Sequence, residues 1–374
     1  MILSSLALQH VRSYAKQTFS FSPHATLIVG ANTAGKTNIL EAIYMMATGK
    51  SFRADADREM IQWGEDVARI RAVGDEMKLE VVITPGVVGG QHAPLKKYLV
   101  NGVARRMIDF VGNLRAVLFW PEHLELVTDS PSVRRKYLDS VLIQVDREYR
   151  RNLISYERGL RQRNRLLDLI NEGTASRSQL VFWDQLLIKA GAYITDKRRE
   201  YIDYVNSHQL PAVSYQIVYD KSVISEARLE QYKQEEVAAK STLVGPHRDD
   251  FVIAKTRNPK PETRNSLNIL LDDLSKYGSR GEQRFAILWL KIAEVSFVQE
   301  KTGERPILLL DDIFSELDEE HKKLVLGIVG KQQTIITSAE EETVRLLKRH
   351  AIANVAVIQL PARYSDSKIV KWVR

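Results

Sequence analysis

The sequence predicts an α/β protein in which a head of mixed sheets and helices is interrupted by an inserted helical arm. Three observations predict this fold class. An apolar strand pattern at residues 26–29 leads through a glycine-rich loop into a helix pattern at 38–46. An Asn-Gly pair at 101–102, flanked by apolar residues, favours a tight antiparallel hairpin. Residues 122–207 have long helical periodicity rich in Arg and Leu, which Pro211 ends.

The order of the elements suggests how the chain is divided. We expect an N-terminal part of the head at 1–121, the helical arm at 122–210 and a C-terminal part of the head at 211–374. Residues 258–262 (NPKPE) have the composition of a loop. Besides 26–29, apolar or alternating runs bounded by turn residues predict strands at 79–84, 98–100, 117–120, 215–219, 251–254 and 307–310.

The composition is that of a globular protein with a sizeable core, since 44% of the 374 residues are hydrophobic and 27% are charged. The first residues lack the basic-then-apolar order of a secretory signal, and no apolar run approaches bilayer length, so we expect a cytoplasmic protein without a membrane partner. The absence of cysteine excludes disulfides and thiolate metal sites. The net charge of +7 suits a polyanionic partner, but it also serves solubility.

The first chemical motif is GANTAGKT at 30–37, which fits the phosphate-binding pattern G-x-x-x-x-G-K-T between a strand and a helix. Backbone N–H groups of such a loop surround a β-phosphate at a helix N-terminus. Lys36 would reach the β- and γ-phosphates, and the Thr37 hydroxyl would bind magnesium. We therefore expect ATP and Mg²⁺ as cofactors. The expected nucleotide contacts are Gly30, Ala31, Asn32, Thr33, Ala34, Gly35, Lys36 and Thr37.

The second motif is an apolar strand pattern at 307–310 that ends on two carboxylates. Asp311 would complete the magnesium site, and Asp312 could polarise the attacking water as a general base. An apolar strand followed by two aspartates is also a common turn or helix N-cap pattern. The phosphate-binding loop upstream favours the catalytic interpretation.

The third motif is SRGEQ at 279–283, which stands directly before a long amphipathic helix pattern and 32 residues before Asp311. A serine hydroxyl, a glycine N–H and a helix N-terminus form an anion site without a lysine, suited to a γ-phosphate presented by another subunit. We therefore expect Ser279 to take part in catalysis and Gly281 and Gln283 to contact nucleotide. The alternative is an ordinary serine-capped helix.

These motifs resemble those of ABC-type ATPase heads, and further segments narrow the resemblance. The interval between Thr37 and Asp311, 274 residues, leaves room for an arm but not for the long coiled coil of SMC proteins. In order along nearly the whole chain, the sequence resembles the RecF family, the recombination-mediator ATPases of bacterial DNA gap repair. The segments that carry this resemblance are VRSYAKQTFSF, GKTNILEAIYMMATGKSFR, SPSVRRKYLD, YERGLRQRNRLL, GPHRDDF, YGSRGEQR and LLLDDIFSELD.

The resemblance implies an ATP-dependent DNA-binding homodimer with weak, DNA-stimulated ATPase activity. It implies binding to duplex DNA and to gapped or single-strand junctions, action with RecR and RecO to load RecA, and links to replication and the SOS response. It also implies that Arg12 lies beside the nucleotide.

Two departures from the family pattern stand out, and one further position differs from many ABC-type relatives. Thr33 and Ala34 replace a Gly-x pair in the loop, and a β-branched Thr33 would be strained at positive φ. Trp120 stands where the family tends to have a small polar residue. In place of the switch histidine of many ABC-type relatives the chain offers only Thr337 and Ser338 as candidates.

Basic residues are concentrated in the predicted arm. Between 134 and 165 there are ten Lys or Arg against four Asp or Glu, most of the net charge of the chain. At 100° per residue, five arginines gather on one helix face. This face is either solvated surface or a contact for DNA phosphates. The candidate DNA-binding residues are Arg147, Arg151, Arg158, Arg161 and Arg165.

Three functions fit the motifs: an ATP-switched DNA clamp, an ATP-driven motor or nuclease-associated ATPase, and a scaffold with structural ATP. Asp312 is one methylene shorter than the glutamate of fast ABC ATPases, which favours slow turnover and hence the clamp. For His247-Arg248-Asp249-Asp250 we expect a structural or ATP-sensing turn rather than a metal site, because no second histidine lies nearby.

Overall fold

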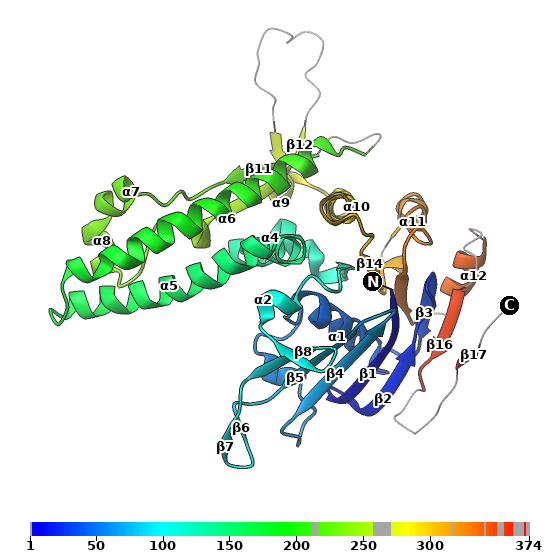
Figure 1. Cartoon of the computed structure of the whole chain (residues 1–374). Helices are drawn as coiled ribbons and strands as arrows, with labels where there is room; N and C mark the ends of the chain where they lie inside the picture. Colours follow the sequence, from blue (N-terminus) through cyan, green and yellow to red (C-terminus); the bar gives the residue numbers. More distant parts are fainter. Residues whose placement is uncertain are drawn as a thin grey trace, which may run out of the picture. The chain divides into compact units, whose positions relative to one another are not determined.

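The computed structural model describes residues 2–210, 215–256, 271–315, 317–339, 342–349, 355–361 and 370–371. The chain divides into two compact units (Figure 1). The first unit is Met1–His123 together with Glu294–Arg374, and the second unit is Leu124–Ala293. The second unit contains residues 124–210 of the expected arm at 122–210 and continues to Ala293. The reason is a separate small sheet after residue 214 whose first strand packs on the last arm helix. Helical periodicity could not reveal that contact.

The first unit contains a sheet in which five neighbouring strands are parallel and a sixth, β17, is antiparallel. Its order is β10-β14-β15-β3-β16-β17. Strands β3 and β14 are buried along their whole length, as expected for parallel strands covered on both faces. The carboxyl ends of the parallel strands meet at one edge, which brings the residues after β3, β14 and β15 together. The bounds are β3 Ala25–Val29, β10 Ala116–Phe119, β14 Ile307–Asp311, β15 Thr334–Ser338, β16 Val355–Gln359 and β17 Val370–Lys371.

A second, antiparallel sheet of the same unit has the order β2-β1-β4-β5-β8-β9. Helix α1 (Lys36–Thr48) contacts strands of both sheets, and most of its residues are buried, which explains its nearly continuous apolar sequence. The bounds are β1 Leu3–Val11, β2 Tyr14–Ser20, β4 Ala68–Gly74, β5 Lys78–Ile83, β8 Lys96–Val100 and β9 Val103–Arg105, with the small hairpin β6 Val87–Val88 and β7 Gln91–His92 and the helices α2 Met107–Phe110, α11 Glu319–Leu326 and α12 Glu342–Arg349.

The second unit is built on two long helices, α5 (Arg147–Asn171) and α6 (Val181–Ser207), which lie side by side (Figure 1). Asp146 caps α5 by accepting hydrogen bonds from two backbone N–H groups of its first turn. A three-stranded sheet, in the order β11-β12-β13, follows α6 in the sequence. The remaining bounds are α3 Glu125–Thr128, α4 Pro131–Val145, β11 Tyr215–Asp220, α7 Glu226–Gln231, α8 Lys233–Ala238, β12 Asp250–Thr256, β13 Leu271–Asp273, α9 Leu274–Tyr277 and α10 Arg280–Thr302.

Each of the seven predicted strands has a counterpart whose bounds agree within two residues. The predicted hairpin is confirmed, since Asn101 and Gly102 have φ of 50 and 79 and join β8 to β9 in a primed turn. Strands β1, β2 and β4 were missed. In β1 and β2 the apolar residues form neither a continuous run nor a regular alternation with polar ones, so neither strand pattern marks them. The predicted loop at 258–262 lies outside the described residues. Within the described part, no helix is both apolar and long enough for a bilayer.

Candidate nucleotide-binding site

The glycine-rich loop joins β3 to α1 at the carboxyl edge of the parallel sheet. Gly35 has φ 92 and directly precedes α1, and a Cβ there would lie 2.9 Å from the hydroxyl of Tyr14. Only glycine fits both demands. The φ of Thr33 is not positive, so the backbone strain considered for this β-branched residue is absent. Residues 31–33 are exposed, which leaves the backbone of the loop open to a ligand.

Lys36 lies across the loop. Its Nζ donates to the carbonyl oxygens of Gly30 at 2.8 Å and Ala31 at 3.1 Å, and the side chain is buried. Burial lowers the pKa of Lys36, while the negative charges of Asp312 and Asp311 oppose this change. The loop therefore holds a desolvated ammonium group, which a polyphosphate would satisfy.

Asp311 ends β14 and is the centre of a small polar cluster. Its Oδ1 accepts from Thr37 Oγ1 at 3.2 Å and from Thr337 Oγ1 at 2.6 Å. The carboxylate is buried, which raises the pKa of Asp311, and the two hydroxyl bonds oppose that rise. Carboxylate and hydroxyl oxygens are ligands that Mg²⁺ prefers, so Thr37 and Asp311 fit a magnesium ion. Thr337, a weak candidate from sequence, belongs to this cluster.

Asp312 follows directly and is half-buried. Its φ is 50, an uncommon conformation for a residue other than glycine. The backbone N–H of Asp312 donates to Thr337 Oγ1 at 3.1 Å, which helps to hold this conformation. Backbone strain of this kind is found at functional sites. The role of Asp312 as general base stays a prediction.

Arg12 is anchored to α1 by a carboxylate that the sequence analysis missed. Its guanidinium donates to both oxygens of Glu41, at 3.0 and 2.7 Å, and to the carbonyl of Glu59 at 2.7 Å. Glu41 is fully buried, and its hydrogen bonds raise the pKa of Arg12. A lone carboxylate in the otherwise apolar stretch ILEAIYMM was the available signal. The predicted contact of Arg12 with nucleotide stays a prediction.

Arg53 is a second residue that the sequence analysis missed. Its backbone N–H donates to Ser51 Oγ at 2.9 Å, and its Nη1 donates to Asn38 Oδ1 at 3.2 Å. Burial raises the pKa of Asp311, and the positive charge of Arg53 is among the influences that oppose this rise. An exposed guanidinium within electrostatic reach of the acidic cluster can bind a phosphate.

The SRGEQ segment belongs to the second unit and opens α10. Ser279 and Gly281 are exposed. The N–H of Ser279 donates to Glu282 Oε2 at 2.9 Å and the N–H of Glu282 donates to Ser279 Oγ at 3.3 Å, which is the reciprocal arrangement of a capping box. The Oγ of Ser279 also donates to Glu282 Oε2 at 2.9 Å. Hydrogen bonds from Lys255 and Ser279 lower the pKa of Glu282 to about 2. Gln283 is buried and donates through Nε2 to the carbonyl of Leu274 at 2.8 Å, so its side-chain amide is directed inward.

The candidate DNA-binding arginines of α5 are all exposed, as their helical spacing predicted. Arg151 also pairs with Glu148 at 2.8 Å. Three other arginines of the basic stretch are buried, namely Arg134, Arg150 and Arg163. Arg163 is neutralised by Glu236 at 2.7 Å and by a second carboxylate. The excess of positive charge at the surface is therefore smaller than the count of charged residues in the sequence, but it remains on one face of α5. The exposed set is Arg147, Arg151, Arg158, Arg161 and Arg165.

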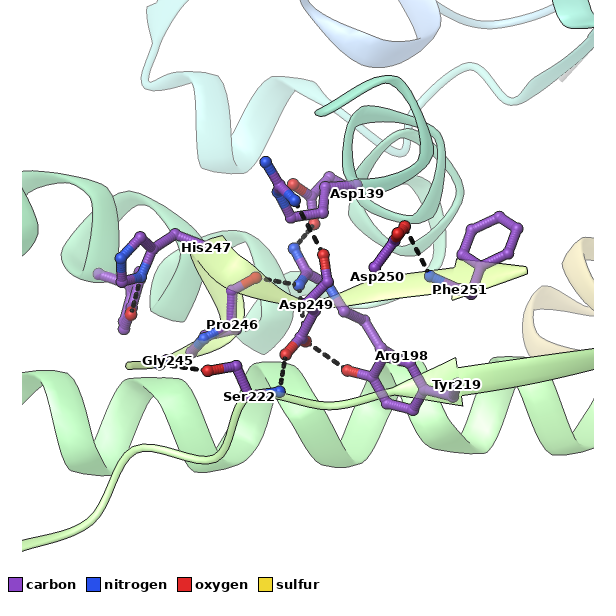
Figure 2. A network of polar contacts seen from close by, with 12 residues as sticks. Asp139, Arg198, Tyr219, Ser222, Gly245, Pro246, His247, Asp249, Asp250 and Phe251 are labelled. Carbon is purple, nitrogen blue, oxygen red and sulfur yellow. Dashed lines mark hydrogen bonds and ion pairs between the residues drawn. The ribbon is translucent and has the colours of Figure 1, made fainter. Parts of the chain in front are cut away.

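The GPHRDDF segment, 245–251, is tied to a buried arginine of α6 (Figure 2). Arg198 donates to the carbonyl of Pro246 at 2.6 Å, to Asp249 Oδ2 at 2.9 Å and to Asp139 Oδ1 at 2.9 Å. Asp249 is fully buried and accepts a further bond from the N–H of Ser222 at 2.7 Å. The segment thus joins the small sheet to the helices. Among the described residues, no group of three or more His, Asp or Glu side chains is placed to hold a metal ion.

His247 of this segment is held as a neutral ring. Its Nδ1 lies 2.8 Å from the Tyr156 hydroxyl and its Nε2 lies 3.0 Å from the carbonyl of Thr242. A hydroxyl donor at Nδ1 and a carbonyl acceptor at Nε2 suit the tautomer protonated at Nε2. Burial lowers the pKa of His247 to about 4.

This histidine should make the stability of the second unit depend on pH. An unfolded histidine titrates near ~6.5, so between that pH and about 4 the unfolded chain binds more protons. The free energy of unfolding should be fully retained above ~6.5 and should fall by up to about 3 kcal/mol as the pH approaches 4. Urea unfolding at pH 7 and pH 5 should show a smaller loss for His247→Gln than for the wild type. Equal losses in the two proteins would contradict the assignment.

A phosphate loop after a parallel strand, together with a second parallel strand that ends in aspartates and is separated from the first by one strand, defines the site of a P-loop nucleoside triphosphatase. Comparisons with known proteins narrow this class. The RecF/RecN/SMC N terminal domain family matches residues 2–359. The DNA replication and repair protein RecF of Herpetosiphon aurantiacus is 34% identical over 91% of this chain and 94% of its own. RecF of Lachnoclostridium phytofermentans is 36% identical over 90% of this chain and 92% of its own.

Structural comparison agrees. A solved structure described as the recombination mediator protein RecF-ATP in the RecFOR pathway has a TM-score of 0.82 and 28% identity, covering 100% of this chain and 98% of that one. The chain belongs to the RecF/RecN/SMC family and, within it, to the RecF proteins. The expected fold is confirmed: an ATPase head with an inserted arm that, in the described residues, is a pair of helices of 25 and 27 residues rather than a long coiled coil.

Proposed function

We propose that this protein is an ATP-switched, DNA-binding protein of recombinational repair and replication. ATP joins two copies of the chain on DNA, and slow hydrolysis separates them. The observation that carries the proposal is the convergence of Lys36, Thr37 and Asp311 at the end of an open phosphate loop. Two relatives named as replication and repair proteins and a neighbour solved with ATP support it.

Within this proposal each residue of the nucleotide site has a separate task. Lys36 balances the charge of the β- and γ-phosphates, while Thr37 and Asp311 hold Mg²⁺. The metal, when bound, neutralises charge on the β- and γ-phosphate oxygens. Asp312 orients the water that attacks the γ-phosphorus, and the bond from that phosphorus to the bridging oxygen of ADP breaks. Because Asp312 is the shorter carboxylate, we expect a weak ATPase that DNA stimulates.

The exposed Ser279 and Gly281 would complete the site of a second copy. The Ser279 hydroxyl, which donates to Glu282 in this structure, would turn to the phosphate. With the N–H of Gly281 it would supply an anion site that has no lysine of its own, so it suits a γ-phosphate held elsewhere by Lys36. The name of the neighbour in the RecFOR pathway supports RecR and RecO as partners. We propose that the dimer acts with them at gapped or single-strand junctions to load RecA, and that it contributes to SOS induction.

Duplex DNA should bind along the exposed arginines of α5. Charge reversal of Arg151, Arg158 and Arg165 to Glu should weaken binding and lower the salt dependence of the association constant by up to about three phosphate contacts. Fluorescence anisotropy titrations from low to moderate salt measure this slope. A matched triple reversal on α6, at Lys189, Lys197 and Arg199, should change the slope much less. Equal slopes for the α5 variant and the wild type would place DNA on the first unit instead.

A further inference from the structure

The donors of Ser279 are already engaged by a carboxylate of the same chain. The backbone N–H and the Oγ of Ser279 both donate to Glu282 Oε2, each at 2.9 Å. Carboxylate and phosphate oxygens are both charged acceptors, so they compete for the same donors. Glu282 therefore holds the hydroxyl that a γ-phosphate from a second copy would need.

The two oxygens of this carboxylate have different partners. Oε2 accepts from Ser279, whereas Oε1 accepts from Nζ of Lys255, on strand β12, at 2.7 Å. The side chains of Lys255 and Glu282 are 43% and 35% exposed. Because an ion pair this open to solvent contributes little stability, it can rearrange easily. The carboxylate can therefore leave Ser279 and keep Lys255.

The backbone around these side chains is fixed by neighbouring elements. The hydroxyl of Tyr215, on β11, donates to the carbonyl of Glu282 at 3.2 Å. The buried side-chain amide of Gln283 donates to the carbonyl of Leu274 at 2.8 Å. The N–H of Gln283 donates to the carbonyl of Ser279 at 2.9 Å, which closes the first turn of α10. A change at this site is therefore an exchange of side-chain partners rather than a movement of the helix end.

The capping box alone does not require the charge of Glu282. Glutamine serves as well as glutamate at this position of the motif, because the cap needs only an oxygen that accepts the N–H of Ser279. Hydrogen bonds from Lys255 and Ser279 lower the pKa of Glu282 to about 2, so the carboxylate is ionised at neutral pH. A full negative charge thus stands beside donors that suit a phosphate. The cap explains the oxygen but not the charge.

We propose that Glu282 and Lys255 control how tightly the γ-phosphate of a second copy enters the Ser279 site, an inference that rests on the proposed role of that site in joining two copies. The charge of Glu282 opposes the phosphate, both by holding the Ser279 hydroxyl and by repulsion. Lys255 balances this charge and keeps the carboxylate when the hydroxyl turns to the phosphate. Both are positioning residues, which set the strength of dimerisation, while Lys36 sets the affinity of one copy for ATP.

Removal of the Glu282 charge should strengthen the dimer. Light scattering of Asp312→Asn over a protein dilution series, with ATP, magnesium and duplex DNA, gives the dissociation constant of the dimer. Adding Glu282→Gln should lower that constant about three- to tenfold, the order expected for one pair of like charges near a protein surface. The affinity for ATP, measured by calorimetry without DNA, should stay within about twofold. The melting temperature should not change, since glutamine keeps the cap.

Removal of the Lys255 charge should have the opposite effect, and only while Glu282 is charged. Lys255→Met should weaken the dimer about three- to tenfold in the Asp312→Asn chain. In the chain that also carries Glu282→Gln it should change the constant less than about twofold, because no charge is left to balance. The matched control is the exposed pair Glu230 and Lys233 of the same unit. Glu230→Gln and Lys233→Met should each have less than about a twofold effect.

Two results would overturn the proposal. One is a Glu282→Gln dimer no tighter than its parent. The other is a Lys255→Met effect that is the same with and without the charge of Glu282, which would give Lys255 a contact of its own. Failure of the proposed function would look different: if Asp312→Asn stayed a single chain with ATP and DNA, or dimerised equally well with Ser279→Arg, the shared site itself would be wrong.

Discussion

Lys36→Ala should lower the affinity for ATP by at least about 100-fold, because it removes a buried positive charge that would donate to two phosphates. The site offers no substitute in the same place: the other donors of the loop are neutral backbone N–H groups. The ammonium of Lys36 already lies within the loop, on the carbonyls of Gly30 and Ala31. Calorimetric titration with ATPγS and magnesium measures the change.

The matched control is Lys50→Ala, just beyond the other end of α1. Lys50 is exposed and lies outside the loop, so its loss removes the same charge from the same chain and should change the affinity less than about twofold. Comparable losses in both variants would mean that Lys36 acts through the net charge of the protein. That result would argue against the loop as the phosphate site.

Arg198→Leu should reduce the free energy of unfolding by about 3–5 kcal/mol. The buried guanidinium donates to Asp139, Asp249 and the carbonyl of Pro246, so its removal leaves the fully buried carboxylate of Asp249 without its ion pair. Such an uncompensated charge is among the most destabilising consequences of a single substitution. Urea unfolding followed by circular dichroism gives the difference.

The neighbouring arginine provides a strict control. Arg199 is partly exposed and pairs only with the exposed Asp196, at 3.5 Å, among the ion pairs of the described residues. Arg199→Leu should therefore cost no more than about 0.5 kcal/mol. If both variants were equally stable, the contacts around the GPHRDDF segment would not hold the second unit together.

The elements that the sequence predicted well are those whose signal is local. The phosphate loop needs a strand, a glycine pattern and a helix in succession, and all three are contiguous. The meeting of Thr37 with Asp311, 274 residues away, followed from topology, because the carboxyl ends of parallel strands share an edge. The hairpin at Asn101 and Gly102 followed from turn chemistry alone.

The features that the sequence did not reveal depend on tertiary packing. Glu41 and Arg53 acquire their roles only when the β1–β2 turn and the segment after α1 fold against the loop. A helix projection could not distinguish the buried Arg163 from the exposed Arg161, because its carboxylate partners come from other helices. The continuation of the second unit beyond residue 210 was not apparent from the sequence for the same reason, since the small sheet after residue 214 packs with the arm.

The central claim is that nucleotide joins two copies, each of which completes the other's site. Light scattering of Asp312→Asn, a variant designed to bind ATP without hydrolysing it, should give twice the chain mass of 42.7 kDa in the presence of ATP, magnesium and duplex DNA. Ser279→Arg should bind ATP with wild-type affinity and keep the mass of one chain. A single-chain mass for Asp312→Asn at saturating ATP and DNA would contradict the account.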